Sequence, residues 1–246
     1  MALLWGLKKG PSRGPKPGLS VERVVRAAIE VADAEGLSAL SMRRVAERVG
    51  VSTMSVYTYV PGKGELLDLM LDEVMGEAVG PDETGGGWRE ELEMVAGRNW
   101  ELYHRHPWVL QVAATSRPPL GPNVIAKYDR ELRAVDGIGL TEVEMDAVLT
   151  LVLGHTDNSA RRSMEAAEAQ KRTGRTDDEW WSANAPLLEK VFDARRYPTA
   201  ARVGPAAGAA YEAAYSPEHA FEFGLQRVLD GIETLVRSRP EQPNRP

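Results

Sequence analysis

The chain contains no cysteine, which excludes disulfides, thiolate nucleophiles and thiolate metal sites. It has no run that approaches the ~20 apolar residues a membrane-spanning helix needs. The first residues, MALLWGLKKG, are apolar and then basic, the reverse of a secretory signal, so we expect a cytoplasmic protein with no membrane partner. No segment alternates apolar and polar residues as a strand does, and no internal repeat is visible, so we expect an all-α fold.

An overall positive charge is also missing, since the formal net charge is −6 over 246 residues. The charge is distributed unevenly along the chain. Residues 1–65 hold ten Lys or Arg and six Asp or Glu, a net of +4, which leaves −10 for the remainder. A small basic head on an acidic body indicates a protein that contacts phosphate at one end only, unless the asymmetry is accidental.

Residues 41–59, SMRRVAERVGVSTMSVYTY, read as two short helices with a tight turn between them. Ser41 and Ser52 can each accept a hydrogen bond from a backbone N–H group in the first turn of a helix. Gly50 can end the first helix in the left-handed conformation common at helix C-termini. A second helix this short does not persist alone in water, so it must be held by its neighbours. This is the helix-turn-helix pattern, whose second helix enters the DNA major groove, although a plain helical hairpin with capping serines would look similar.

Residues 19 to about 75 resemble the TetR family of bacterial transcriptional repressors. The resemblance rests on ADAEGLSALSMRRVAERVGV followed by STMSVYTYVPGKGELLDLM, and most of all on YTYVPGK with ELL directly after it. The remainder resembles, more weakly, the branch of this family with a larger pocket, through HPW at 106–108, RPPLGPN at 117–123 and FEFGLQRVLDGIE at 221–233. The resemblance implies an all-helical homodimer that binds palindromic operator DNA and releases it when a small molecule enters the C-terminal domain.

Four segments are expected along the chain. Residues 1–18, with four Lys or Arg and three prolines, are predicted to be a flexible basic arm, which either reaches into the minor groove or is a solvated tail. Residues 19–79 are predicted to form a three-helix DNA-binding head, with the helix-turn-helix motif at about 41–60. Residues 88–238 are predicted to form a helical body for ligand binding and dimerisation, and 239–246 a disordered tail. Within the body we expect Pro186 to interrupt helix 179–192, and the Ala-, Gly- and Pro-rich segment 197–216 to be mobile or weakly helical.

The head is expected to contact DNA in two ways. By resemblance, Ser41, Tyr57, Tyr59 and Lys63 occupy positions that grip phosphate, with the Tyr57 ring packed under its helix. Arg43 can reach a base edge, and a two-pronged contact from Arg to guanine is the commonest specific contact. The second motif helix begins with short side chains that suit contact with thymine methyl groups, where other family members carry Gln, Arg or Lys, so direct readout by this helix is expected to be sparse. The complete predicted set is Ser41, Met42, Arg43, Ser52, Thr53, Met54, Ser55, Tyr57, Tyr59 and Lys63.

The body is expected to hold a small-molecule site. His155 and Ser159 continue an apolar stripe of helix 141–169, so they face a cavity or a subunit interface, or belong to a hydrogen-bonded core. An apolar cavity with a few placed polar groups is the usual form of such a site, although recurring aromatic residues are also common in cores. The predicted effector is small and largely apolar or aromatic. The residues predicted to bind it are Trp100, His104, Trp108, Leu149, His155 and Trp180.

Gly224 and Gly231 lie seven residues apart in the last helix. Glycine costs roughly 1 kcal/mol in a helix interior, so the pair suggests close approach to another helix, most simply across a dimer. Helix 141–169 would complete a four-helix interface, and a two-fold dimer would match a palindromic site. His104 and His106 are two residues apart and would face opposite ways on a helix, so we expect no metal and no cofactor.

The sequence therefore predicts a ligand-responsive repressor that binds operator DNA as a homodimer and is not an enzyme. An enzyme would need a nucleophile–base pair or paired carboxylates, and no such constellation is visible. An architectural DNA binder without an effector would need a basic body, whereas this body is acidic.

Overall fold

The computed structural model describes residues 1–7, 19–80, 85–115, 119–211 and 215–239. Over these ranges the regular structure consists of eleven α-helices and two short 3-10 helices, with no strand. The prediction of an all-α fold is therefore confirmed. None of the helices in the described part of the chain is both long and apolar enough to cross a membrane.

The head comprises α1 (Val21–Glu35), α2 (Met42–Val49) and α3 (Thr53–Tyr59). Each helix begins after a serine whose hydroxyl accepts a backbone N–H, and these serines are Ser20, Ser41 and Ser52. Gly50 has φ 79° and ψ 36°, the left-handed conformation expected at the end of α2. The two capping serines and the glycine of the motif thus act as the sequence predicts, and they set the turn between α2 and α3.

Helix α4 (Lys63–Met75) joins the head to the body and continues into the 3-10 helix η1 (Gly76–Ala78). Its buried side chains Leu66 and Met70 belong to one hydrophobic cluster that also contains Val24 and Val45 of the head and Val109 of the body. The head is therefore not a separate folding unit with its own core, because its hydrophobic core is continuous with that of the body. Burial of apolar surface across this junction couples the positions of the two parts.

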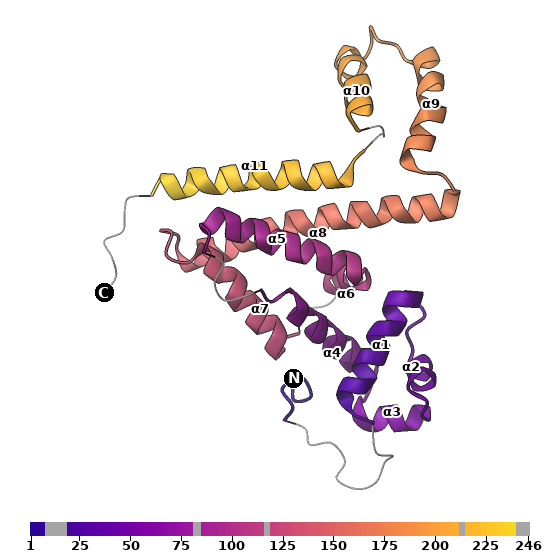
Figure 1. Cartoon of the computed structure of the whole chain (residues 1–246), viewed down its shortest axis with the longest axis vertical. Helices are drawn as coiled ribbons and strands as arrows, with labels where there is room; N and C mark the ends of the chain where they lie inside the picture. Colours follow the sequence, from indigo (N-terminus) through magenta and orange to yellow (C-terminus); the bar gives the residue numbers. More distant parts are fainter. Residues whose placement is uncertain (8–18, 81–84, 116–118, 212–214, 240–246) are drawn as a thin grey trace.

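The body is an assembly of helices in which the two longest lie side by side (Figure 1). Its elements are α5 (Trp88–Arg105), α6 (Trp108–Thr115), α7 (Pro122–Leu132), η2 (Arg133–Val135), α8 (Glu142–Thr173) and α11 (Pro217–Arg237). Thr141 and Glu144 form the capping box expected at the start of α8. A second hydrophobic cluster joins Leu92 of α5, Val152 of α8 and Leu229 of α11.

Helix α7 is capped by a side chain from another helix. The carboxylate of Asp72 in α4 accepts the backbone N–H groups of Asn123 at 3.1 Å and Val124 at 3.0 Å. A Cβ atom at Gly121 would lie 2.1 Å from the Asp72 carboxylate, so glycine is required there. This contact fixes α7 against α4. Burial raises the pKa of Asp72, while the two N–H groups oppose that shift.

Helices α9 (Asp177–Val191) and α10 (Pro198–Tyr211) form a pair that projects from the body (Figure 1). One prediction was wrong here. Pro186 lies inside a continuous α9, since a proline removes one backbone hydrogen bond without always ending a helix. The segment predicted to be mobile or weakly helical contains α10, because alanine is the strongest helix former and Gly208 packs against the Trp181 ring.

The first seven residues lie against the body. The indole N–H of Trp5 donates to the carbonyl oxygen of Leu120 at 2.9 Å. The predicted flexible arm therefore has one end bonded to the turn before α7, while residues 8–18 lie outside the described part. At the other end, Arg239, expected to start the disordered tail, forms an ion pair with Glu144, and residues 240–246 lie outside the described part.

Candidate nucleic-acid interface and effector site

Helix α3 presents an exposed face at the end of the molecule opposite α9 and α10 (Figure 1). Met54 is 75% exposed and Tyr57 is 42% exposed, whereas Val56 on the other side is completely buried. The Ser52 and Ser55 hydroxyls are bonded to each other at 2.8 Å, and Thr53 is half-buried. The short helix is thus held by one apolar anchor and its cap, with its remaining side chains available to a partner.

The three arginines of α2 differ in how tightly they are held. Arg44 bonds Glu35 at 2.5 Å and Arg48 bonds Glu30 at 2.8 Å, so both guanidinium groups are tied to α1. The Arg44 guanidinium lowers the pKa of Glu35. The Arg43 side chain is 82% exposed, and its one ion pair within the described part of the chain is with Glu47, at 3.7 Å on its own helix. Such an exposed pair is weak, so Arg43 can turn to a partner at little cost.

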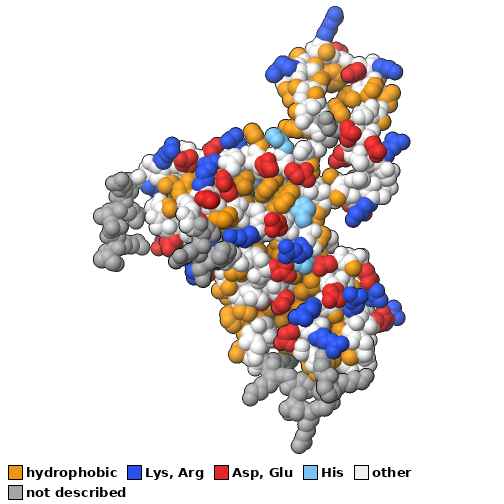
Figure 2. All heavy atoms as spheres, in the orientation of Figure 1, with side chains coloured by type: hydrophobic (Ala, Val, Ile, Leu, Met, Phe, Trp, Pro, Cys, Tyr) orange, Lys and Arg blue, Asp and Glu red, His pale blue; other side chains and the backbone are white. Residues whose placement is uncertain are grey.

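The charged groups on the visible face of the head are intermixed rather than segregated. Figure 2 shows Lys and Arg side chains lying among Asp and Glu side chains there. The ion pairs of Arg44 and Arg48 with glutamates of α1 are examples of this mixing of charges. Fewer cationic groups of the head therefore remain available to phosphate than its number of Lys and Arg residues suggests.

Three predicted DNA contacts are partly or wholly engaged within the protein itself. Met42 is only 6% exposed and packs in the hydrophobic cluster of the head, so the structure removes it from the contact surface. Position 42 follows the Ser41 cap, and the first turn of α2 points it inward. Lys63 donates from Nζ to the carbonyl oxygen of Leu40 at 2.7 Å. An ammonium has three donors, so Lys63 retains two for a phosphate while its position is fixed. Tyr59 is half-buried against the same cluster.

Three predicted effector residues come together around a residue that the sequence analysis did not select. The Trp100 ring stacks on Phe221 with centroids 4.4 Å apart, and His104 lies against Trp100 at the same separation. His155 bonds the Phe221 carbonyl oxygen at 2.9 Å and stacks on its ring. His104 also bonds the Ser163 hydroxyl at 3.0 Å. Phe221 is the first residue of the apolar stripe of α11, and this position was the one signal in the sequence that it packs against the other three residues.

The other three predicted effector residues lie elsewhere. Trp108 is 1% exposed, and its indole N–H donates to Asp33 of α1 at 2.7 Å, so it belongs to the junction between head and body. Leu149 is also 1% exposed and is part of the core. Trp180 is 47% exposed on the projecting α9. Aromatic character alone does not distinguish an effector site from a domain junction or a surface position.

The junction that holds Trp108 is polar as well as apolar. His106, 4% exposed, lies between two carboxylates, with Nδ1 2.8 Å from Asp33 and Nε2 3.3 Å from Glu77. Arg105 forms an ion pair with Glu77 at 2.7 Å. Asp33 therefore connects the end of α1 to both His106 and Trp108. Among the described residues, no group of three or more His, Asp or Glu side chains is arranged to hold a metal ion.

Gly224 and Gly231 have different surroundings, although the sequence analysis treated them alike. A Cβ atom at Gly224 would lie 2.2 Å from the His155 ring, so its close approach is to α8 of the same chain, not to a second protomer. Gly231 has no heavy atom within 4 Å of that position. It lies instead in an open groove between α8 and α11, lined by residues that include Ala147, Leu151 and Val228.

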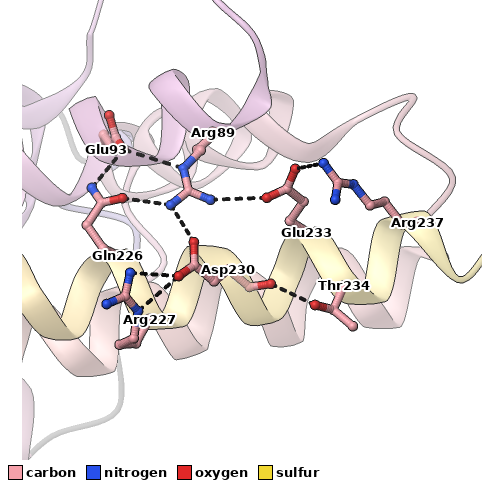
Figure 3. Close-up of polar contacts among 8 residues, drawn as sticks. All are labelled: Arg89, Glu93, Gln226, Arg227, Asp230, Glu233, Thr234 and Arg237. Atoms are coloured by element: carbon pink, nitrogen blue, oxygen red, sulfur yellow. Dashed lines mark hydrogen bonds and ion pairs between the residues drawn. The ribbon is translucent and has the colours of Figure 1, made fainter.

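Arg89 fixes α11 to α5 on another side of the helix (Figure 3). Its guanidinium contacts Gln226 at 2.6 Å, Asp230 at 2.8 Å and Glu233 at 3.6 Å. Arg89 and Arg227 both lower the pKa of Asp230. These contacts use one polar side of α11, and the groove around Gly231 occupies a different one.

Comparison with known proteins is consistent along the whole chain. Residues 24–70 match the family model described as bacterial regulatory proteins, tetR family, and residues 80–236 match the tetracyclin repressor-like, C-terminal domain. The chain is 48% identical over 241 residues to the HTH-type transcriptional repressor DrrR1 of Streptomyces coeruleorubidus, covering 97% of this chain and 86% of that protein. The structure is similar to apo ActR of Streptomyces coelicolor, with TM-score 0.74 and 25% identity over 91% of this chain and 99% of ActR. It is also similar to the S. coelicolor regulator SCO7222, with TM-score 0.68 and 28% identity over 89% of this chain and 100% of that one. The chain therefore belongs to the TetR family of bacterial transcriptional regulators.

Proposed function

We propose that this regulator is a repressor that binds a palindromic operator as a homodimer and is released by a small, largely apolar or aromatic effector. The observation that carries the DNA-binding part is the exposed face of α3, held by the Ser52 cap and by buried Val56. The homologous DrrR1 of S. coeruleorubidus is a transcriptional repressor by name. The proposed DNA contacts are Ser41, Arg43, Ser52, Thr53, Met54, Ser55, Tyr57, Tyr59 and Lys63.

The dimer is proposed to form through α8 and α11. Their groove exposes apolar side chains, and Leu151 in it is 53% exposed. Gly231 lets a partner helix come close there, since nothing in its own protomer fills the space. Two heads related by a two-fold axis then meet two half-sites of a palindromic operator.

The effector is proposed to bind in the body beside the Trp100, His104, His155 and Phe221 group. S. coelicolor ActR, similar in fold, has been solved with actinorhodin. An effector lowers DNA affinity if it binds more tightly to a dimer whose two heads are spaced wrongly for the operator half-sites. Operator DNA must then weaken effector binding by the same factor. A gel shift on DNA flanking the protein's own gene, repeated with actinorhodin as a first probe, tests both halves. A compound that binds free and operator-bound protein equally well, yet releases DNA, would contradict the scheme.

Arg43→Ala is expected to cost about 1–3 kcal/mol on the operator and to relax preference at one base pair. The reason is that Arg43 is the most exposed arginine of α2, while α3 begins with short side chains that offer few base contacts of their own. Arg48→Ala, whose guanidinium is held by Glu30, is the matched control and should leave base preference unchanged. Binding is measured by fluorescence anisotropy on the operator and on single-base variants. Equal losses on operator and random DNA would make Arg43 a phosphate contact.

Lys63→Ala is expected to weaken binding to all DNA sequences similarly and to flatten the salt dependence by about one unit of slope. Lys63 is held in place by the Leu40 carbonyl oxygen, so it loses little freedom when it meets a phosphate. Lys190→Ala, on exposed α9, is the control and should leave the slope unchanged. The slope is read from affinities at several salt concentrations. An unaltered slope in Lys63→Ala removes this residue from the contact surface.

A further inference from the structure

Six polar side chains meet inside the body where the surrounding core is apolar. Helices α5, α7 and α8 each contribute two of them, four residues apart and thus on one helix face. The six are Asn99 and Tyr103, Lys127 and Glu131, and Asp157 and Arg161. Four of them are almost completely buried: Asn99 is 0%, Glu131 4%, Tyr103 5% and Lys127 7% exposed. We refer to these six residues as the interior polar cluster.

The contacts within the interior polar cluster join the three helices. Asn99 donates from Nδ2 to Glu131 at 2.7 Å, and Lys127 forms an ion pair with the same carboxylate at 2.7 Å. The Tyr103 hydroxyl interacts with the Asp157 carboxylate, and the burial of the phenol together with the charge on Asp157 raises the pKa of Tyr103 well above its usual value. Two cations face two carboxylates, so the cluster has no formal charge to attract an anion.

Among the residues that the structure describes, two buried acceptors of the cluster have no hydrogen-bond partner: Asn99 Oδ1 and Asp157 Oδ1. The Asn99 amide cannot be turned round to relieve this, because its Nδ2 already donates to the Val95 carbonyl oxygen at 2.9 Å and to Glu131. A carboxylate has no donor to offer in any orientation. Buried polar atoms in native proteins nearly always have a hydrogen-bond partner. Two unpaired acceptors in one cluster therefore indicate that a hydrogen-bond donor binds there.

We infer that the interior polar cluster is the polar part of the effector site, and that Asn99 and Asp157 accept hydrogen bonds from a hydroxyl or protonated amine of the effector. This inference rests on the proposed function. The aromatic group is built on the same two helices: Trp100 and His104 share α5 with Asn99 and Tyr103, and His155 shares α8 with Asp157. The effector is thus expected to combine an aromatic part with a donor group.

The cluster is also connected to the head. Arg161 donates to the Leu110 carbonyl oxygen of α6 at 2.6 Å. Helix α6 begins with Trp108, whose indole is bonded to Asp33 of α1. Asp157 and Arg161 lie on the same helix, α8. An effector group that draws Asp157 toward itself is therefore expected to act, through Arg161, on α6, which contacts the head directly.

The inference is tested by fluorine NMR titration of the full-length protein with three probes that share one ring. Para-fluorobenzyl alcohol and para-fluorobenzylamine each carry a donor, and para-fluorotoluene carries none. Both donor probes are expected to bind at least about tenfold more tightly than the toluene, since a polar site rejects a ligand that leaves it unpaired. The stronger of the two donor probes identifies whether the hydroxyl or the amine is preferred. Equal binding of all three would overturn the inference.

Asp157→Asn is the variant that tests the proposed role of Asp157 as a hydrogen-bond acceptor. The asparagine keeps the shape and one oxygen for Tyr103, but replaces the unpaired acceptor by an N–H donor. The donor probes should lose about tenfold in affinity, and para-fluorobenzaldehyde, which only accepts, should gain. Asp146→Asn is the control, because Asp146 on the same helix accepts from Tyr128 at 2.7 Å in an exposed copy of the same pair. Unchanged probe affinities in Asp157→Asn would overturn the inference.

Tyr103→Phe keeps the test decisive if Asp157→Asn does not fold by circular dichroism. It leaves Asp157 with a further unpaired oxygen, so donor probes should bind as well or better, and a loss would contradict the inference. Operator affinity is measured on each sample without probe. Intact operator binding with no donor preference means that the inference fails while the proposed function stands. Absent operator binding in the wild-type protein means that the proposed function itself fails.

Discussion

Gly231→Leu is expected to yield a monomer that binds the operator roughly 100-fold more weakly, because joining two half-site contacts in one dimer is worth about that much. Within one protomer the added Cβ has space, since among the described residues no heavy atom lies within 4 Å of its position. It would project into the groove between α8 and α11, where the partner is proposed to lie. The head is far from this change, and every proposed DNA contact stays intact.

Gly97→Leu is the matched control for that experiment. Gly97 is a helical glycine of α5 with equally open surroundings, and it does not line the groove. Both variants are examined by sedimentation equilibrium and by operator binding. A Gly231→Leu protein that remains dimeric would place the interface elsewhere, whereas monomers from both variants would show that the glycines matter for folding and not for association.

Trp108→Ala is expected to lower the free energy of unfolding by about 3–5 kcal/mol, the usual cost of removing a large buried aromatic side chain. Trp108 is 1% exposed and bonds Asp33, so the change leaves a cavity and removes one of the two hydrogen bonds made by Asp33 Oδ1 at the junction of head and body, while the bond to His106 remains. Chemical denaturation, followed by circular dichroism, measures this loss. Because α1 is held there, operator binding should also become more sensitive to temperature.

Trp180→Ala provides the comparison, since both changes remove the same side chain. Trp180 is 47% exposed on α9, and its loss should change stability by no more than about 0.5 kcal/mol. Similar losses for the two variants would show that the junction contributes no more than the projecting helices. A small effect of Trp108→Ala alone would mean that head and body are coupled by α4 and not by the contacts of Asp33.

The head could be predicted because its signals are local. Ser41, Gly50 and Ser52 determine where helices begin and end through hydrogen bonds to atoms within four residues. The inward orientation of Met42 was missed, although it also follows from the first turn of α2. Arg43 was selected as the arginine that reaches a base edge, but the ion pairs that hold Arg44 and Arg48 were not predicted, because they depend on carboxylates of α1 that are distant in sequence.

The body was less predictable because its contacts are between helices far apart in sequence. Trp108 was assigned to the effector site, but its partner Asp33 is 75 residues away. Gly224 was assigned to the dimer, whereas it makes room for His155 of its own chain. The interior polar cluster was not predicted at all, since its six residues are individually ordinary. Only the packing of α5, α7 and α8 brings them together and leaves two acceptors unpaired.

We expect α3 and Arg43 to give this regulator sequence-specific DNA binding, which an effector reverses. Fluorescence anisotropy with labelled DNA flanking the protein's own gene, competed by unlabelled DNA of the same and of scrambled sequence, tests it most directly. The specific competitor is expected to displace the protein at least about 10³-fold more effectively than the scrambled one, which is the lower end of the range for specific regulators. Equal displacement by both competitors would contradict it.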